Sequence, residues 1–237
     1  MNSIRKTLFG LFIISLPFSL QAQSSFPEGL ITYQADTVRR LEPHPAAYIA
    51  TQLLVYRKAG TTRLEVWRSN YRKPADTMKV VQVRNGTGTY TWLEYADSTR
   101  AAAGNLALFV SYEEEKQLQQ AQALAQPQGK PQVRKVVDRV QWLGLPAERI
   151  ALAKSPNEPS EAVVTKALDL PLGAVFPAVL SLPGTPLQFT DGDIGWLTRF
   201  TANKLQPQAV SDNLFVVDPS LKVVSLTESK QMISDFD

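Results

Sequence analysis

The sequence predicts a mainly β protein of the α+β class, either an antiparallel sheet with a helix on one side or a partly closed barrel. Short runs of β-branched and aromatic residues recur along the chain and are separated by Gly, Pro, Asn and Asp. These runs follow one another too closely for parallel crossover connections, which need about a dozen residues or more. A single segment has the capping pattern and the length of a surface helix.

The first half of the chain is expected to form a strand and two hairpins. A first strand at 29–35 is followed by a polar, proline-containing stretch at 36–47, which is typical of a loop. The turn sequences Ala59-Gly60 and Asn85-Gly86-Thr87-Gly88 join the strands 52–58 and 61–68, and 78–84 and 89–95. For Asn-Gly we expect both central residues at positive φ, and we prefer this hairpin to an N-glycosylation sequon at Asn85-Gly86-Thr87.

The helix is predicted to begin near Ser111. Ser111 and Glu114 have capping-box spacing, and the acidic residues at 113–115 suit the positive end of the helix dipole. The apolar stripe of this segment is thin, so we expect a surface helix with one narrow face against the sheet. The helix ends before Pro127, and the linker 126–132 is the only plausible internal boundary.

The second half predicts further strands around an apolar segment, Pro171 to Pro186, that four prolines interrupt. Asp191-Gly192-Asp193 is expected to be a hairpin turn. Asp218-Pro219-Ser220-Leu221 has turn chemistry and is expected to join a last pair of strands. The strands expected in this half are 133–142, 148–153, 161–168, 187–190, 196–204, 214–217 and 222–226.

The N-terminus has the features of a secretory signal. Arg5 and Lys6 precede an apolar run at 8–20, and Ala22 provides a small residue at a plausible cleavage point. The run is too short for a membrane span, which needs about 20 apolar residues, and no other stretch is longer. We therefore predict a cleaved signal peptide at residues 1–22, a single domain at 23–237, no transmembrane segment after cleavage, and a location in the periplasm or outside the cell.

The composition disfavours several classes of function. The 237 residues include no Cys and one His, so disulfide scaffolds, thiolate metal sites and cysteine nucleophiles are excluded. The 25 Lys+Arg and 22 Asp+Glu leave the chain nearly neutral, which gives little support for nucleic-acid binding. His44 lies between prolines in a loop, so neither an imidazole metal site nor a Ser-His-acid triad is expected. Asp191 and Asp193 are the one compact acidic pair, but the supporting groups of a calcium loop or a hydrolase are missing.

Several predicted strands are apolar on both faces, whereas a sheet with one solvated face alternates cleanly. In strand 89–95, Tyr90 and Trp92 share one face, and Leu93 and Tyr95 share the other. One interpretation is that the helix and the Pro171–Pro186 segment cover the second face as ordinary packing. The other is a partly open apolar cavity beneath these covers that takes a lipid chain or an acylated partner.

A recognisable order of short motifs runs through most of the chain after residue 25. It starts with FPEGLITY at 26–33, and the second half continues with LPGTPLQF at 182–189, TRF at 198–200, Lys204-Leu205 and DNLFVVDP at 212–219. This order resembles exported Bacteroidetes-type domains of unknown function related to the GLPGLI family, and is similar, more distantly, to the LolA/LolB lipoprotein-carrier fold. The resemblance implies an antiparallel sheet curled into a half-barrel around an apolar cavity, with the main helix and the proline-rich segment as a lid.

Two hypotheses of function follow from these expectations. The first is a non-enzymatic periplasmic binding protein that holds an apolar ligand, a lipid or an acylated protein, in the curled sheet. The second is an interaction or structural protein of the cell envelope with a filled core and no ligand. Neither hypothesis needs a catalytic residue, a metal or a cofactor. The candidate residues that line the cavity are Leu64, Val66, Tyr90, Trp92, Trp196 and Phe200.

Overall fold

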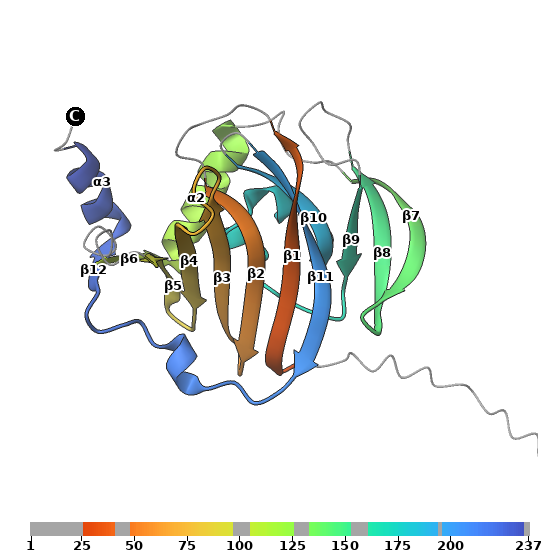
Figure 1. The fold of residues 1–237 in the computed structure, drawn as a ribbon, viewed down its shortest axis with the longest axis horizontal. Coiled ribbons are helices and arrows are strands. Elements are labelled where there is room, and N and C mark those ends of the chain that lie inside the picture. The colour runs from red at the N-terminus through yellow and green to blue at the C-terminus, as the bar shows by residue number, and fades with distance from the viewer. Residues whose placement is uncertain are drawn as a thin grey trace, which may run out of the picture.

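The computed structural model describes residues 26–40, 48–96, 105–125, 133–152, 161–193 and 196–234. The predicted signal peptide at 1–22 and His44 lie outside these ranges. The described chain is mainly β, with one sheet of twelve strands and two α-helices (Figure 1). This architecture confirms the predicted fold class at the level of an antiparallel sheet with helices beside it.

The sheet has the strand order β12-β6-β5-β4-β3-β2-β1-β11-β10-β9-β8-β7, so β12 and β7 are its two edges and it is not closed into a barrel. All neighbouring strands are antiparallel except β12, which is parallel to β6. The strands are β1 (Glu28–Arg40), β2 (Tyr48–Lys58), β3 (Thr61–Asn70), β4 (Thr77–Arg84), β5 (Gly88–Tyr95), β6 (Leu106–Ser111), β7 (Val133–Trp142), β8 (Leu145–Leu152), β9 (Glu161–Thr165), β10 (Thr185–Asp193), β11 (Trp196–Pro207) and β12 (Lys222–Ser225).

Two hairpins have two-residue turns in which both residues lie at positive φ. Ala59-Gly60 joins β2 to β3 with φ angles of 47° and 84°. Leu143-Gly144 joins β7 to β8 with φ angles of 52° and 79°. Such turns match the right-handed twist of the strands they connect. The predicted Ala59-Gly60 hairpin is therefore confirmed, whereas β8 begins at Leu145 and not at residue 148 as expected.

The predicted hairpin at Asn85 is also present, but its turn differs from the expected type. Arg84 of β4 pairs with Thr89 of β5, so four residues lie between these paired positions, and neither Asn85 nor Gly86 lies at positive φ. Instead, Asn85 Oδ1 accepts a hydrogen bond from the Thr87 backbone N–H at 2.9 Å. An asparagine side chain can stabilise a longer turn in this way without a left-handed backbone.

Helix α2 (Tyr112–Ala125) begins as the sequence predicts. The Ser111 backbone N–H and hydroxyl donate to Glu114 Oε2 at 2.9 and 2.8 Å, and the Glu114 N–H donates to Ser111 Oγ at 3.3 Å. These reciprocal bonds confirm the capping box. The hydrogen bond from the Ser111 backbone, followed by that from its side chain, lowers the pKa of Glu114 below its usual value.

Two segments that we expected to be loops or turns belong to strands. Strand β1 does not end at residue 35, because residues 36–40 pair with β11 and Asp36 lies opposite Arg199. Asp191-Gly192-Asp193 is part of β10, where Asp191 lies opposite Thr198 of β11. Polar strand segments and loops have similar compositions, so composition alone did not separate them. The connecting residues 41–47 and 194–195 lie outside the described ranges.

The C-terminal region does not form the predicted pair of strands. Residues 212–215 form a short 3-10 helix, η4, and β12 pairs with β6 instead of with residues 214–217. The predicted turn is present, because the Leu221 N–H donates to Asp218 O at 3.0 Å, but it joins no hairpin. A second helix, α3 (Leu226–Ser234), follows β12 and was not predicted. We call residues 208–234 the C-terminal arm; in Figure 1 it passes along the lower end of the sheet to β12.

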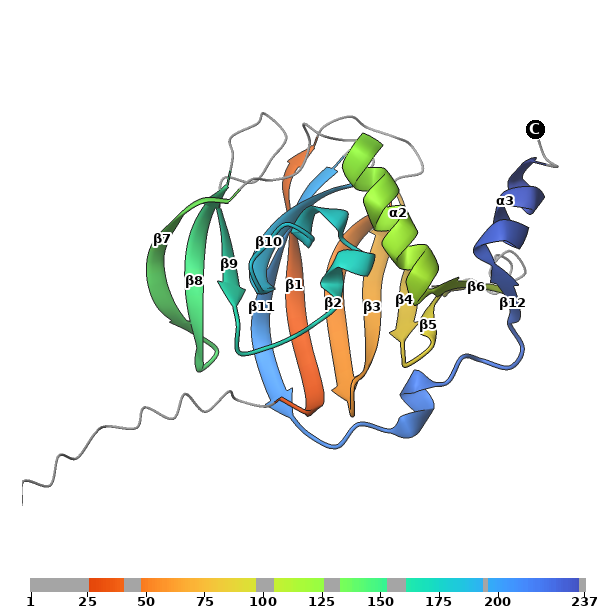
Figure 2. The ribbon, with the colours of Figure 1, turned by 180° about the vertical axis from the view of Figure 1, so that it is seen from behind.

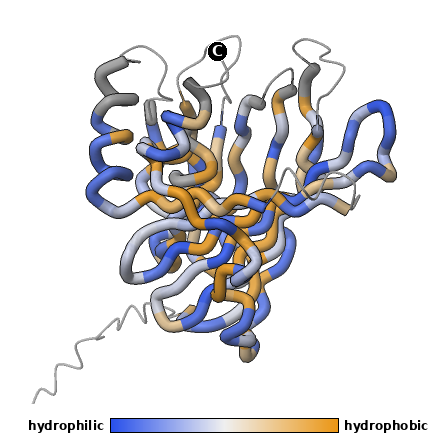
Figure 3. Tube along the Cα trace, turned by 90° about the vertical axis from the view of Figure 1, so that its left-hand side faces the viewer, coloured by the Kyte–Doolittle hydropathy of each residue, from blue (hydrophilic) through white to orange (hydrophobic). Residues whose placement is uncertain are grey.

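The two faces of the sheet have different covers. The core face carries the main apolar cluster, which includes Tyr33, Leu53 and Phe200, and residues 168–182 pack against it. In Figure 2, α2 and the short helical turns of 172–179 lie on this side of the sheet. The opposite face, which we call the arm face, carries a smaller cluster on β4, β5 and β6 under residues of the C-terminal arm. The alternation of hydrophobic and hydrophilic residues along the strands is visible in Figure 3.

The covers differ from the expected ones in one respect. The proline-rich segment packs on the core face, and residues 185 and 186 already belong to β10. The second apolar face is covered by Phe215, Val217 and Leu221 of the C-terminal arm. The arm face is therefore covered by the C-terminal arm and not by α2, whose apolar stripe is thin.

Tyr33 provides a test of the core that depends on pH. Its buried hydroxyl donates to Pro186 O at 2.9 Å, and burial raises the pKa of Tyr33 well above its usual value of 10. Tyr33→Phe is expected to cost about 1 kcal/mol at pH 7, because a buried carbonyl loses its partner. Above pH 10 the tyrosine ionises in the unfolded chain while the folded state keeps it neutral, so the wild type loses about 1.4 kcal/mol per pH unit relative to the variant.

Urea unfolding of the wild type and Tyr33→Phe at pH 7 and pH 11 measures this difference. The stability contributed by the hydroxyl is fully present below pH 10, so the advantage of the wild type should have disappeared by about pH 11. An advantage that stays the same at both pH values would show that Tyr33 ionises equally easily in the folded and unfolded states.

Candidate functional site

The structure does not bring the six predicted lining residues together. Leu64 and Val66 on β3 and Phe200 on β11 are buried in the core-face cluster. Tyr90 and Trp92 on β5 belong to the arm-face cluster, on the other side of the sheet. Trp196 begins β11, and its side chain is not part of the described structure.

The space around the core-face residues is filled by aromatic packing. The ring of Phe176, from the segment above the sheet, lies 5.1 Å from that of Phe189 and 4.8 Å from that of Phe200. Phe189 and Phe200 are stacked with their centroids 5.0 Å apart. Phe200 is thus a core residue, and open space on this face must lie elsewhere.

Two neighbouring hollows lie on the core face, and Arg84 lines both. The first, which we call the apolar hollow, has a volume of about 290 Å³. The second, which we call the helix hollow, has a volume of about 430 Å³ and lies against the first two turns of α2. The apolar side chains that line the first hollow are Leu168, Leu170, Pro171, Val179, Leu180, Leu182 and Pro186, and Arg84, Asp169 and Thr185 complete its lining with polar groups. The residues that line the second, besides Arg84, are Tyr112, Glu115 and Lys116.

Tight local turns give residues 168–184 the shape that leaves the apolar hollow open. Thr185 Oγ1 donates to Leu168 O at 2.9 Å and accepts from the Leu170 N–H at 3.0 Å, which ties both ends of the loop together. Gly184 has φ +151°, and a Cβ there would lie 2.6 Å from Thr165 O, so the close passage of the chain requires glycine. The buried ring of Phe176 then anchors the middle of the loop in the core.

Arg84 is the last residue of β4 and lies between the two hollows. Its Nη2 atom is 3.2 Å from Glu115 Oε2, and its guanidinium lies 4.9 Å from the ring centre of Tyr112. Glu115 also accepts a hydrogen bond from Thr89 Oγ1, and the Tyr112 hydroxyl donates to Asn85 O. The start of α2 is thereby attached to the end of the β4–β5 hairpin, and Arg84 remains 30% exposed.

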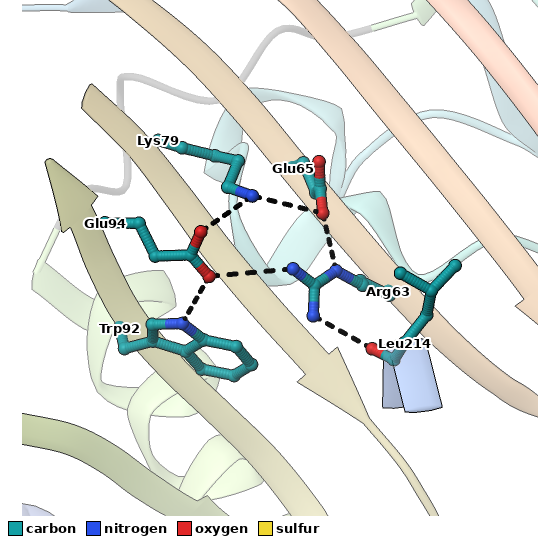
Figure 4. A network of polar contacts seen from close by, with 6 residues as sticks. All are labelled: Arg63, Glu65, Lys79, Trp92, Glu94 and Leu214. Atoms are coloured by element: carbon teal, nitrogen blue, oxygen red, sulfur yellow. Dashed lines mark hydrogen bonds and ion pairs between the residues drawn. The ribbon is translucent and has the colours of Figure 1, made fainter. Parts of the chain in front are cut away.

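A second polar cluster lies on the arm face (Figure 4). Arg63 and Glu65 are only 8% and 6% exposed, and Arg63 Nε is 2.7 Å from Glu65 Oε1. Lys79 Nζ lies 2.7 Å from Glu94 Oε2, and Trp92 Nε1 donates to Glu94 Oε1 at 2.9 Å. Burial alone would raise the pKa of Glu94, but the hydrogen bonds from Lys79 and Trp92 and the nearby positive charges outweigh it and lower the pKa.

This cluster attaches the C-terminal arm to the sheet. Arg63 Nη1 donates to Leu214 O at 2.9 Å, and Lys58, which lies outside the cluster, makes a second attachment through a 2.9 Å hydrogen bond from Nζ to Val210 O. Every charge in the cluster has a partner of opposite sign, so we interpret it as structural. The alternation of charged and apolar residues in TRLEVWR, at 62–68, was its signal in the sequence.

Other chemistry has little support among the residues that the structure describes. No group of three His, Cys, Asp or Glu side chains in these ranges could hold a metal ion. No helix within them has the length and hydropathy needed to cross a bilayer. In the acidic pair Asp191 and Asp193, Asp191 lies in β10 and pairs with Thr198 of β11. The side chain of Asp193 is outside the described structure.

Comparison with known proteins does not place this chain in a family. No protein-family model matches it, and a search of the curated proteins finds no match. The assignment of function therefore depends on the geometry of the two hollows and of Arg84.

Proposed function

We propose that this chain is a non-enzymatic, exported binding protein that holds an acyl chain, from a lipid or an acylated protein, in the apolar hollow of the core face. In this proposal the sheet acts as a half-barrel, and residues 168–184 together with α2 act as its lid. The predicted signal peptide would direct the protein to the periplasm or out of the cell. The likeness to GLPGLI-related domains and to the LolA/LolB fold, which was inferred from short motifs, is part of the same proposal.

The observation that carries the proposal is an apolar hollow that stays open beside a fully packed core. Seven apolar side chains line it beside Arg84, Asp169 and Thr185, and its volume of about 290 Å³ is just below the range typical of ligand pockets, about 300 to 1,000 Å³. A space of this size suits one acyl chain rather than a folded partner. Its loop cover is attached through Phe176 and Thr185 and carries few charges.

A second candidate function is the interaction or structural protein with a filled core. The packing of Leu64, Val66 and Phe200 favours it, because these predicted cavity residues are fully buried by the protein itself. The two functions make different predictions about uptake of an apolar probe.

Uptake of the neutral fluorescent probe 1-aminoanthracene tests the first function. The wild type should bind it, and Leu180→Glu should bind it at least about tenfold more weakly, because a charged side chain replaces an apolar wall of the hollow and holds water where the neutral probe would lie. Leu143→Glu is the matched control, since Leu143 is also a turn leucine, is also 37% exposed and lines neither hollow. Native mass spectrometry of protein from its own host should then reveal a bound amphiphile.

Two results would decide against acyl-chain binding at this place. One is the absence of probe uptake by the wild type, together with a clean unliganded mass. The other is equal uptake by the wild type, Leu180→Glu and Leu143→Glu. Either would favour the filled-core alternative.

A further inference from the structure

Arg84 has an unusual position for a surface arginine, because it forms a wall of both hollows. Arginine carries five N–H donors in a planar fork. In the described part of the chain its one ionic partner is Glu115, reached through a single guanidinium nitrogen at 3.2 Å. The guanidinium lies over the Tyr112 ring, with its carbon 4.9 Å from the ring centre. Several N–H donors of the Arg84 guanidinium are therefore available for a ligand where the apolar hollow meets the helix hollow.

The charges around this point are slightly positive in sum. Lys116 lines the helix hollow, and Arg57 Nη1 donates to Asp169 O at 2.7 Å at the edge of the apolar hollow. Against these three cations, Arg84 included, stand the carboxylates of Glu115 and Asp169. The charges that line the two hollows cancel, +2 − 2 = 0, and Arg57 beside them adds one positive charge, so an added anion meets no net repulsion here.

We propose that Arg84 is the head-group site of the ligand: its guanidinium receives the carboxylate or phosphate of a single-chain anionic amphiphile whose chain enters the apolar hollow. This inference rests on the proposed function and adds the chemical class of the ligand. A carboxylate or phosphate matches the guanidinium fork with two parallel hydrogen bonds, which a neutral alcohol cannot form. Glu115 keeps its bond to Thr89 Oγ1 when Arg84 turns toward the ligand, so its carboxylate is not left without a partner.

Chain-matched ligands separate head-group recognition from chain binding. Decanoate, decyl phosphate and 1-decanol are compared by displacement of 1-aminoanthracene at low salt and pH 7.5, with the wild type, Arg84→Gln and Arg84→Lys. The wild type should prefer the two anions to decanol by about tenfold or more. In Arg84→Gln this preference should fall to near one, and Arg84→Lys, which keeps the charge without the fork, should be intermediate. The stronger of the two anions identifies the head group as carboxylate or phosphate.

Arg139→Gln is the control for loss of a positive charge, because Arg139 is 87% exposed on β7 and lines neither hollow. It should retain the wild-type preference. If the wild type binds decanoate and decanol equally, or if Arg84→Gln and Arg139→Gln behave alike, the head-group assignment is wrong while acyl-chain binding stands. If none of the amphiphiles displaces the probe and the probe itself does not bind, it is the proposed function that fails.

Discussion

Replacing Phe176 with alanine is expected to lower the free energy of unfolding by about 3–5 kcal/mol. The Phe176 ring is buried and contacts the rings of Phe189 and Phe200, so its loss leaves a cavity at the centre of the aromatic cluster. It also detaches the middle of the loop that covers the core face. Urea unfolding followed by far-UV circular dichroism measures the change.

The control for this variant is Phe176→Leu, which keeps most of the buried volume. We expect it to cost less than about 1.5 kcal/mol, because volume-conserving apolar substitutions are tolerated. An alanine variant that loses no more stability than the leucine variant would mean that residues 168–184 are not anchored in the core through this ring.

Replacing Arg63 with methionine is expected to cost about 3 kcal/mol, the low end of the range for breaking a buried ion pair. The substitution removes the partner of Glu65 and the donor to Leu214 O, but Glu65 keeps Lys79 Nζ at 3.5 Å. The C-terminal arm should loosen as well. Faster hydrogen exchange at residues 212–225, together with urea unfolding, measures both effects.

The effect of Arg63→Met should depend on pH in a defined direction. The pKa of Glu94 is lowered in the folded state, so its contribution is fully present above the ordinary carboxylate range and is lost as the pH falls through the lowered value. The difference between wild type and variant should therefore shrink below about pH 4. Arg139→Met, at an exposed pair with Glu148, should change stability by no more than about 0.5 kcal/mol. Equal effects of the two substitutions would contradict a buried structural role for Arg63.

The features that the sequence predicted correctly depend on residues close together in the chain. The Ala59-Gly60 turn and the bonds between Ser111 and Glu114 involve neighbours within four positions, so local chemistry was enough to identify them. The turn at Asn85 shows the limit of this approach. Asn-Gly predicted the hairpin, but the pairing of the flanking strands determined its length.

The faces of different strands could not be matched without the register. Leu64 and Trp92 each lie on an apolar side of their own strand, and the sequence gives no way to compare the two sides. In the structure Glu65 pairs with Val81, and Val81 pairs with Trp92, so Trp92 shares a face with Glu65 and points away from Leu64. This long-range pairing is the reason that the predicted lining residues are divided between two faces.

The candidate site was missed for the same reason. The sequence predicts only that Arg84 ends a strand. It lines a hollow because residues 168–186, far along the chain, fold over the same face of the sheet. The C-terminal arm was misread as a hairpin because Phe215 and Val217 are apolar, but they pack on the sheet instead of pairing in it.

The most direct test of the central claim is to locate a bound acyl chain. A fatty acid with a diazirine at the end of its chain is photolysed with the wild-type protein, and the adducts are mapped by peptide mass spectrometry. Acyl-chain binding in the apolar hollow predicts adducts concentrated in the peptide that contains residues 168–186, and their loss in Leu180→Glu. Adducts on the arm face of β3–β5, or scattered over the chain and unchanged by Leu180→Glu, would contradict it.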